Sequence, residues 1–163
     1  MNTYRFLRAY MAGIVVPTIA VPFGLVVFII ARYGFQIPVP IERVVIFPMA
    51  LIPTLFGLWN MLYARLSTGR YLPLGLHGAL LPVVLIPLGM AGAVAGQFLS
   101  LGSKGIVWFD AITIPYTLFV PWIAVVMMVY YLIWKYLVGF CNKILELPGY
   151  GIRGPNRTDP ADH

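Results

Sequence analysis

The residues AYMAGIVVPTIAVPFGLVVFIIA, numbers 9–31, form a stretch without a single charged side chain. An α-helix needs roughly 20 apolar residues to cross the hydrocarbon core of a bilayer, so this stretch is long enough to do so. It is also longer than the apolar region of a secretory signal peptide, which has about 7–15 residues. The stretch ends at Arg32 without a convincing cleavage site. We therefore expect it to be a retained transmembrane helix.

The rest of the chain has a similar composition. Of its 163 residues, 61% are hydrophobic and 10% are charged, whereas soluble domains have about 25% charged residues. Further apolar stretches predict spans at about 44–64, 74–101 and 110–135. The predicted fold is an all-α integral membrane protein, a bundle of four transmembrane helices. Residues 1–147 would form the membrane domain, ending in a juxtamembrane helix, and residues 148–163 a flexible polar tail.

The distribution of basic residues predicts the orientation of this bundle. Eight of the 11 Lys and Arg residues lie in the N-terminal segment, the loop between the second and third spans, and the C-terminal segment. The positive-inside rule then places both termini in the cytoplasm, and in a bacterium the host would be the plasma membrane. The net charge of +6 is spread over short loops beside the spans. This distribution favours anionic lipids over nucleic acid as partners.

Each predicted span carries two prolines with four or five residues between them. Proline removes a backbone donor and bends a helix, which membrane helices tolerate when neighbouring groups satisfy the freed carbonyl. The pattern P-x4-P-x-G occurs in both the first and the third span. It suggests two parallel helical-hairpin repeats, with independent proline kinks as the alternative. The predicted kinks are at Pro17, Pro22, Pro48, Pro53, Pro82, Pro87, Pro115 and Pro121.

The sequence GMAGAVAG at 89–96 gives the strongest signal for helix packing. Small residues at a spacing of four allow two helix backbones to approach closely in a membrane. The predicted packing positions are Gly89, Gly92, Ala93 and Gly96. They would contact either another helix of the same chain or a second subunit.

Few polar side chains lie within the predicted spans, and four of them are candidate functional residues. The amides of Asn60 and Gln97 are expected to form interhelical hydrogen bonds. Asp110 lies at the outer start of the fourth span. A carboxylate at this position would cap the helix or pair with a cation; alternatively, it would mark an ion route. His77, at the inner boundary of the third span, is expected to contact head groups. Basic residues predicted on the same side as Asp110 are Arg32, Arg43 and Lys104.

The sequence contains no known catalytic motif such as HExxH, GxSxG or a P-loop. The single cysteine, Cys141, excludes a multi-thiolate metal site, and we predict neither a metal nor a cofactor. These observations favour a non-catalytic membrane protein, a self-associating or accessory subunit of a membrane assembly. One alternative is a small-solute or ion transporter or channel. Another is a lipid-modifying enzyme that uses Asp110 or His77. The expected partners are membrane lipids and a second copy or another membrane protein.

Overall fold

The computed structural model describes residues 3–44, 49–67, 72–110 and 112–147. Its secondary structure is mostly helical, at 76%. The elements in chain order are α1 (Thr3–Gly34), α2 (Ile41–Val44), α3 (Ala50–Leu66), α4 (Leu74–Ala79), α5 (Leu81–Ala95), β1 (Leu99–Leu101), β2 (Gly105–Trp108), β3 (Ile112–Pro115), α6 (Tyr116–Leu132), the π-helical turn η2 (Ile133–Val138) and α7 (Gly139–Ile144).

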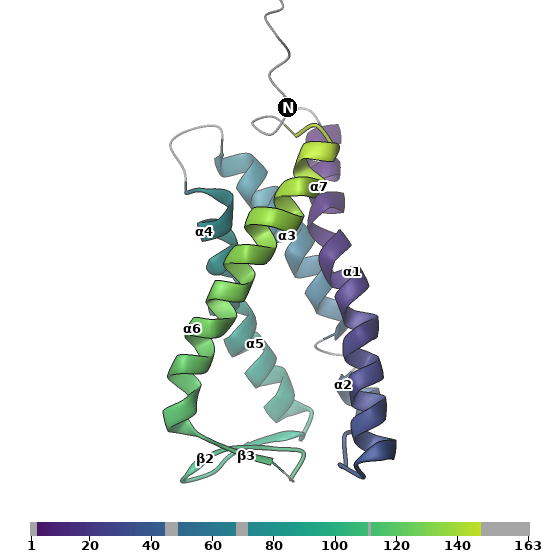
Figure 1. Ribbon diagram of the computed structural model, residues 1–163, viewed down its shortest axis with the longest axis vertical. Helices are drawn as coiled ribbons and strands as arrows, with labels where there is room; N and C mark the ends of the chain where they lie inside the picture. The colour runs from purple at the N-terminus through teal and green to yellow at the C-terminus, as the bar shows by residue number, and fades with distance from the viewer. Residues whose placement is uncertain (1–2, 45–48, 68–71, 111, 148–163) are drawn as a thin grey trace, which may run out of the picture.

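The long helices lie along the longest axis of the molecule, as Figure 1 shows. The three strands form a small sheet across one end, which we call the sheet end. The first turns of α1 and helix α7 lie together at the opposite end, which we call the α7 end. The first turns of α1 and the last described helix, α7, therefore lie at the same end of the bundle.

Three helical stretches among the described residues are long and apolar enough to cross a membrane. They are Tyr4–Gly34, Leu74–Ala95 and Tyr116–Ile144. The predicted second span corresponds to α3, which has 17 residues and begins at Ala50. Residues 45–48, which precede it, lie outside the described part of the chain. The structure thus supports the membrane class and three candidate spans, and the fourth crossing stays a prediction.

The expectation of an all-α fold is wrong for residues 99–115, where the chain forms a three-stranded antiparallel sheet. The predicted third span therefore ends at Ala95, and the fourth begins at Tyr116. The physical reason lies in the residue types. This segment is rich in Ile, Val, Thr and Trp and is broken by the turn GSKG, a pattern that is typical of short strands and hairpins.

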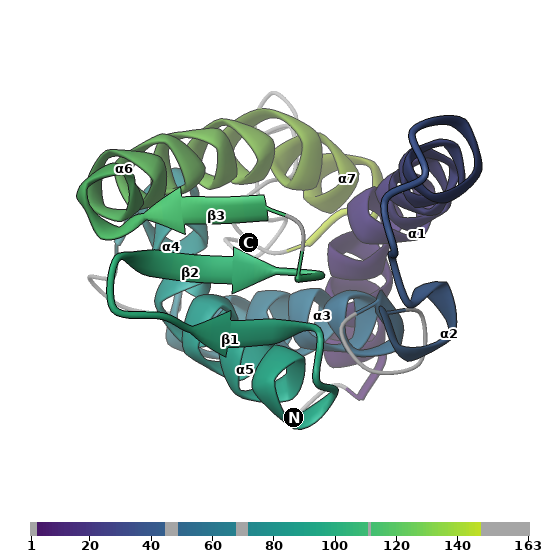
Figure 2. The same ribbon diagram turned by 90° about the horizontal axis from the view of Figure 1, so that it is seen from below.

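The sheet has one apolar face. Because successive side chains of a strand point to opposite sides, the register assigns each residue to a face. Leu99 pairs with Trp108, and Ile106 pairs with Ile114. The second face carries Ser100, Val107 and Thr113. The apolar face consists of Leu99, Leu101, Ile106, Trp108, Ile112 and Ile114. Figure 2 shows the sheet from below, covering the ends of α5 and α6.

The closest contact between two long helices joins α1 to α3. A Cβ atom added to Gly13 would lie 2.6 Å from the carbonyl oxygen of Phe56 and 2.9 Å from the Cα of Gly57. Ala9 and Ala12 are fully buried beside this crossing, with Ala64 of α3. The small residues Ala9 and Gly13 have the four-residue spacing that permits close packing. From the sequence, close packing through small residues was predicted for the third span and not for the first.

Five of the predicted kink prolines lie in helix interiors of the described part of the chain, and two others lie at helix starts. Pro82 lies in the first turn of α5, where proline replaces no helical hydrogen bond, and Pro115 caps the start of α6. Pro48 lies outside the described residues. In α1 the hydroxyl of Thr18 donates a hydrogen bond to the carbonyl oxygen of Ile14 at 2.7 Å. The prolines inside helices are Pro17, Pro22, Pro53, Pro87 and Pro121.

Candidate functional site

Two buried amides connect three helices near the α7 end. Asn60 of α3 and Asn142 of α7 are each 1% exposed. The Nδ2 of Asn60 donates to the carbonyl oxygen of Ala9 at 2.7 Å and to Oδ1 of Asn142 at 2.8 Å. The Nδ2 of Asn142 donates back to Oδ1 of Asn60 at 3.3 Å. Such interhelical bonds contribute roughly 0.6–2 kcal/mol each in a membrane, so Asn60 serves to hold α1, α3 and α7 together.

His77 of α4 is enclosed by aromatic rings. Its ring stacks on that of Trp59, with centroids 5.0 Å apart, and it contacts Tyr63 and Trp134 at 5.1 and 5.8 Å. Its Nε2 lies 3.0 Å from the carbonyl oxygen of Trp59, and the indole Nε1 of Trp59 donates to the carbonyl oxygen of His77 at 2.9 Å. His77 is fully buried, not at a head-group surface as expected, because α3 and η2 close over it.

The other two polar candidates, Gln97 and Asp110, border one polar cleft at the sheet end. The cleft has a volume of about 470 Å³, and its wall also includes Arg32 and Glu42. Arg32 Nη1 lies 3.1 Å from Oε1 of Glu42, so this guanidinium pairs with that carboxylate. Arg32 was predicted to lie on the same side as Asp110, but its pairing with Glu42 was not predicted.

The backbone bordering this polar cleft is unusual. Gln97, Phe109 and Asp110 have φ angles of 59°, 54° and 52°. Residues other than glycine adopt this left-handed region uncommonly, at a cost of about 1 kcal/mol or more. The stacked rings of Phe98 and Phe109, with centroids 6.0 Å apart, hold the two segments together. The side chains of Gln97 and Asp110 are exposed, so they can meet solutes or head groups.

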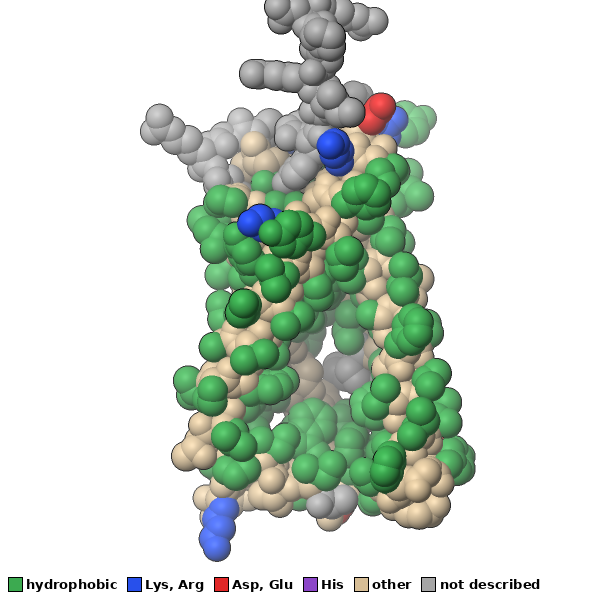
Figure 3. Space-filling view, in the orientation of Figure 1, with side chains coloured by type: hydrophobic (Ala, Val, Ile, Leu, Met, Phe, Trp, Pro, Cys, Tyr) green, Lys and Arg blue, Asp and Glu red, His purple; other side chains and the backbone are tan. Residues whose placement is uncertain are grey.

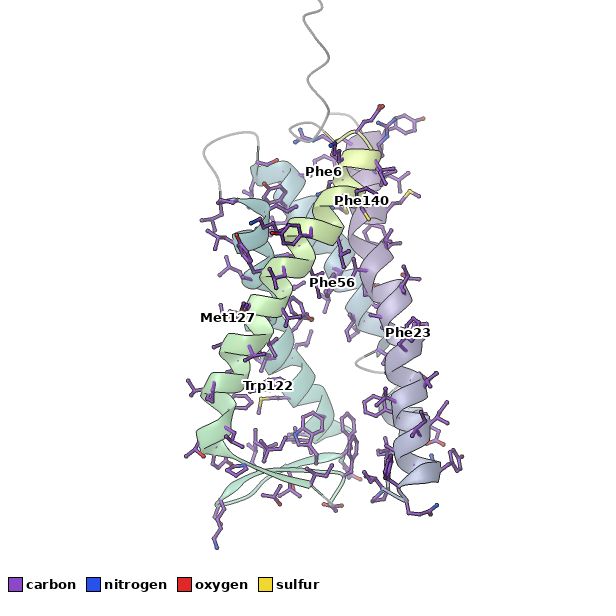
Figure 4. The ribbon with its side chains drawn as sticks, viewed as in Figure 1. Phe6, Phe23, Phe56, Trp122, Met127 and Phe140 are labelled. Atoms are coloured by element: carbon purple, nitrogen blue, oxygen red, sulfur yellow. The ribbon has the colours of Figure 1, made fainter. Side chains whose placement is uncertain are left out.

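A second cleft is apolar and lies between α5, α6 and the sheet. We call it the wedge cleft; its volume is about 610 Å³. Figure 1 shows α5 and α6 diverging toward the sheet, and Figure 3 shows a hollow above the sheet beside α6. Figure 4 shows Trp122 on the cleft side of α6 and Met127 on its other side. The lining is Pro82, Leu85, Ile86, Gly89, Met90, Leu99, Ile106, Trp108, Ile114, Leu118, Phe119, Trp122, Val126 and Tyr130.

The predicted packing strip of α5 does not lie against one long helix. A Cβ atom on Gly89 would find no atom within 4 Å, because Gly89 borders the wedge cleft. Gly92 and Ala93 are buried, and Ala93 belongs to the cluster around Phe98. A Cβ atom on Gly96 would lie 2.6 Å from the ring of Phe98. Within the chain, Gly92, Ala93 and Gly96 therefore pack near the turn into the sheet, whereas Gly89 leaves open space beside the wedge cleft.

Sequence reasoning missed the wedge cleft altogether. Its residues on α6 recur at helical spacing, but lipid-facing residues are equally apolar, so the pattern gives no distinguishing signal. No group of three or more His, Cys, Asp or Glu side chains in the described part of the chain could hold a metal ion. No family model matches this chain, and comparison with curated proteins and with solved structures also finds no match.

Proposed function

We propose that the chain is an integral membrane protein with four transmembrane helices, a self-associating or accessory subunit that carries out no catalysis. One observation supports this proposal above the others. The amides of Asn60 and Asn142 and the ring of His77 are buried in helix contacts, while the wedge cleft is apolar. A solute path needs polar groups from several helices around a wet cavity. The described interior is better suited to packing.

The proposed orientation places the α7 end in the cytoplasm and the sheet end outside, in the plasma membrane if the host is a bacterium. The α7 end carries Arg5 and Arg8 of α1, Arg65 of α3 and Lys143 of α7. This excess of basic side chains at one end agrees with the positive-inside rule. Membrane lipids are the surrounding partners, since large apolar side chains remain exposed along α1 and α6.

A second candidate function, a small-solute or ion transporter or channel, is favoured by the polar cleft. Arg32, Glu42, Gln97 and Asp110 would form its mouth at the sheet end. A lipid-modifying enzyme that uses Asp110 or His77 has less support. His77 is fully buried among aromatic rings. Asp110 lies between β2 and β3 at the sheet end, away from α4, so neither side chain would have the other as a catalytic partner.

Cross-linking in native membranes followed by native mass spectrometry in mild detergent tests the subunit proposal. We expect the chain to be recovered as a complex, with a second copy or another membrane protein, because a subunit keeps its contacts in the membrane. The matched control is the same sample dissolved in denaturing detergent before cross-linking, which should yield the monomer. Recovery of a strict monomer without any partner from native membranes would contradict the proposal.

Flux measurements on proteoliposomes separate the two candidate functions. A subunit without a solute path should pass ions and small polar solutes no faster than protein-free vesicles do. A transporter would show flux that falls on Asp110→Asn and on Gln97→Ala. Flux that is present and unaffected by both substitutions would exclude the polar cleft as its mouth.

A further inference from the structure

The wedge cleft widens toward the sheet, and the sheet closes this wide end. α5 and α6 approach each other at the end of the cleft away from the sheet, where Pro82 and Tyr130 border it, and they diverge toward the sheet. The apolar face of the sheet lies across the gap and contributes Leu99, Ile106 and Ile114 to its lining. At about 610 Å³ the cleft has the size of a small-molecule site, about 300–1,000 Å³.

The chemistry of the lining selects an uncharged, apolar occupant. None of the described residues that border the cleft is charged, and its aromatic members are Trp108, Phe119, Trp122 and Tyr130. An apolar cavity does not hold water well, because a water molecule needs two or more polar partners. Hydrocarbon is the complementary filling, since it needs no hydrogen-bond partner in the cleft and gains dispersion contacts with the lining.

The shape of the cleft excludes a transmembrane helix of another protein. Such a helix has a diameter of about 10–12 Å and must continue through about 30 Å of hydrocarbon. The strands β1–β3 lie across the wide end and would obstruct it. A lipid chain has no such requirement, because it ends within the membrane and can enter from the side.

We propose that the wedge cleft is a binding site for a hydrocarbon chain of a membrane lipid from the leaflet at the sheet end. This inference rests on the membrane setting proposed above but not on self-association. The turn between β1 and β2 carries Lys104, an exposed cation two residues before Ile106 of the lining. Its ammonium group complements an anionic head group at this edge of the membrane. The site thus selects a lipid with an anionic head and a flexible apolar chain.

Gly89 offers a way to fill the cleft without disturbing the protein. Because a Cβ atom at this position has no neighbour within 4 Å, a large side chain can extend into the open space. Gly89→Phe would occupy part of the volume that the lipid chain needs. Gly89→Ala is the matched control, because it also replaces glycine by a residue of higher helix propensity but leaves most of the cleft open.

The experiment uses the full chain in phosphatidylcholine vesicles containing a minor amount of phosphatidylglycerol with a diazirine on one acyl chain. After illumination, mass spectrometry locates the adducts. We expect them to concentrate on residues of the lining such as Met90, Phe119 and Trp122. Because the phenyl ring would occupy space that the acyl chain needs, Gly89→Phe should reduce these adducts to the level found on the exposed side chains of α1. Gly89→Ala should retain them.

The controls separate the head group from the chain. Lys104→Gln should weaken labelling by the phosphatidylglycerol probe at low salt, and should leave labelling by a phosphatidylcholine probe unchanged. Equal effects on both probes, or none, would overturn the role of Lys104. If Gly89→Phe does not fold, the distribution of adducts on the wild-type protein still tests whether the wedge cleft binds the lipid chain. Adducts spread evenly over the exposed side chains of α1 and α6 would overturn the site itself. A strict monomer that keeps the concentrated adducts would refute only the subunit proposal.

Discussion

Replacing Gly13 by alanine is expected to destabilise the protein by about 2–3 kcal/mol, because the new methyl group meets backbone atoms of α3. Its Cβ would lie 2.6 Å from the oxygen of Phe56 and 2.9 Å from the Cα of Gly57. Neither atom can move away by a side-chain rotation, so the two helices must separate. Separation would also lengthen the bond from Asn60 to the oxygen of Ala9. Titration with sodium dodecyl sulfate, followed by circular dichroism, measures this change in the free energy of unfolding.

The matched control is Gly24→Ala in the same helix. A Cβ atom at Gly24 would lie 3.5 Å from the terminal methyl of Met49, an ordinary van der Waals contact. Both substitutions raise helix propensity, by up to about 1 kcal/mol in water, so they differ mainly in what the methyl group meets. We expect the Gly24 variant to be unchanged or slightly more stable. Equal losses of stability in the two variants would contradict the close crossing of α1 and α3.

Gly78→Ala is expected to have an effect of similar size, about 3 kcal/mol, at the contact between α4 and η2. The added Cβ would lie 2.0 Å from Cγ of Trp134, an impossible distance, and the indole ring is fully buried. Trp134 also packs on Phe56, with ring centroids 5.9 Å apart. The indole therefore has no free space into which it can turn. Loss of the near-ultraviolet circular dichroism of the tryptophans at a lower detergent concentration than in the wild type would measure the effect.

A double-mutant cycle with Trp134→Leu makes this prediction specific. Trp134→Leu alone should cost several kcal/mol, since truncation of a buried tryptophan leaves a cavity, typically about 3–5 kcal/mol for replacement by alanine. In the Gly78→Ala background the second substitution should cost less, because the smaller side chain removes the overlap. Additive effects would show that residues 78 and 134 do not touch. Gly89→Ala, which adds a methyl group in open space on α5, is the neutral control.

Residue composition alone predicts the membrane class, because so many apolar and so few charged side chains cannot form a soluble domain of this size. The long uncharged run at 9–31 lies within α1, and the apolar stretch after Leu74 forms α4 and α5. The boundaries near the sheet were wrong for a definite reason. Apolar residues such as Phe98 and Leu101 continue the third apolar stretch, and Ile112 and Ile114 precede the fourth, so the predicted spans were extended over residues 96–101 and 110–115. Only the alternation of β-branched and aromatic side chains around the GSKG turn distinguishes a sheet there.

The candidate sites were predicted less well than the fold. Asn60 was identified as an interhelical hydrogen-bonding residue, but its partner Asn142 lies 82 positions away, in the segment predicted to be a juxtamembrane helix. Gln97 and Asp110 were each singled out, yet their placement beside one cleft depends on the turns of the sheet. The wedge cleft arises from the divergence of α5 and α6. A divergence angle is a property of tertiary packing, which no local pattern of residues encodes.

Labelling of single cysteines from both sides of sealed vesicles tests whether this helical bundle crosses the membrane in the proposed orientation. In a Cys141→Ser background, a cysteine is placed at each of three exposed positions: Arg8 of α1, Lys143 of α7 and Lys104 of the sheet turn. A membrane-impermeant maleimide is then applied to right-side-out and to inverted vesicles. We expect positions 8 and 143 to react only in inverted vesicles and position 104 to react only in right-side-out vesicles. Labelling of all three positions from the same side would contradict a bundle that crosses the membrane.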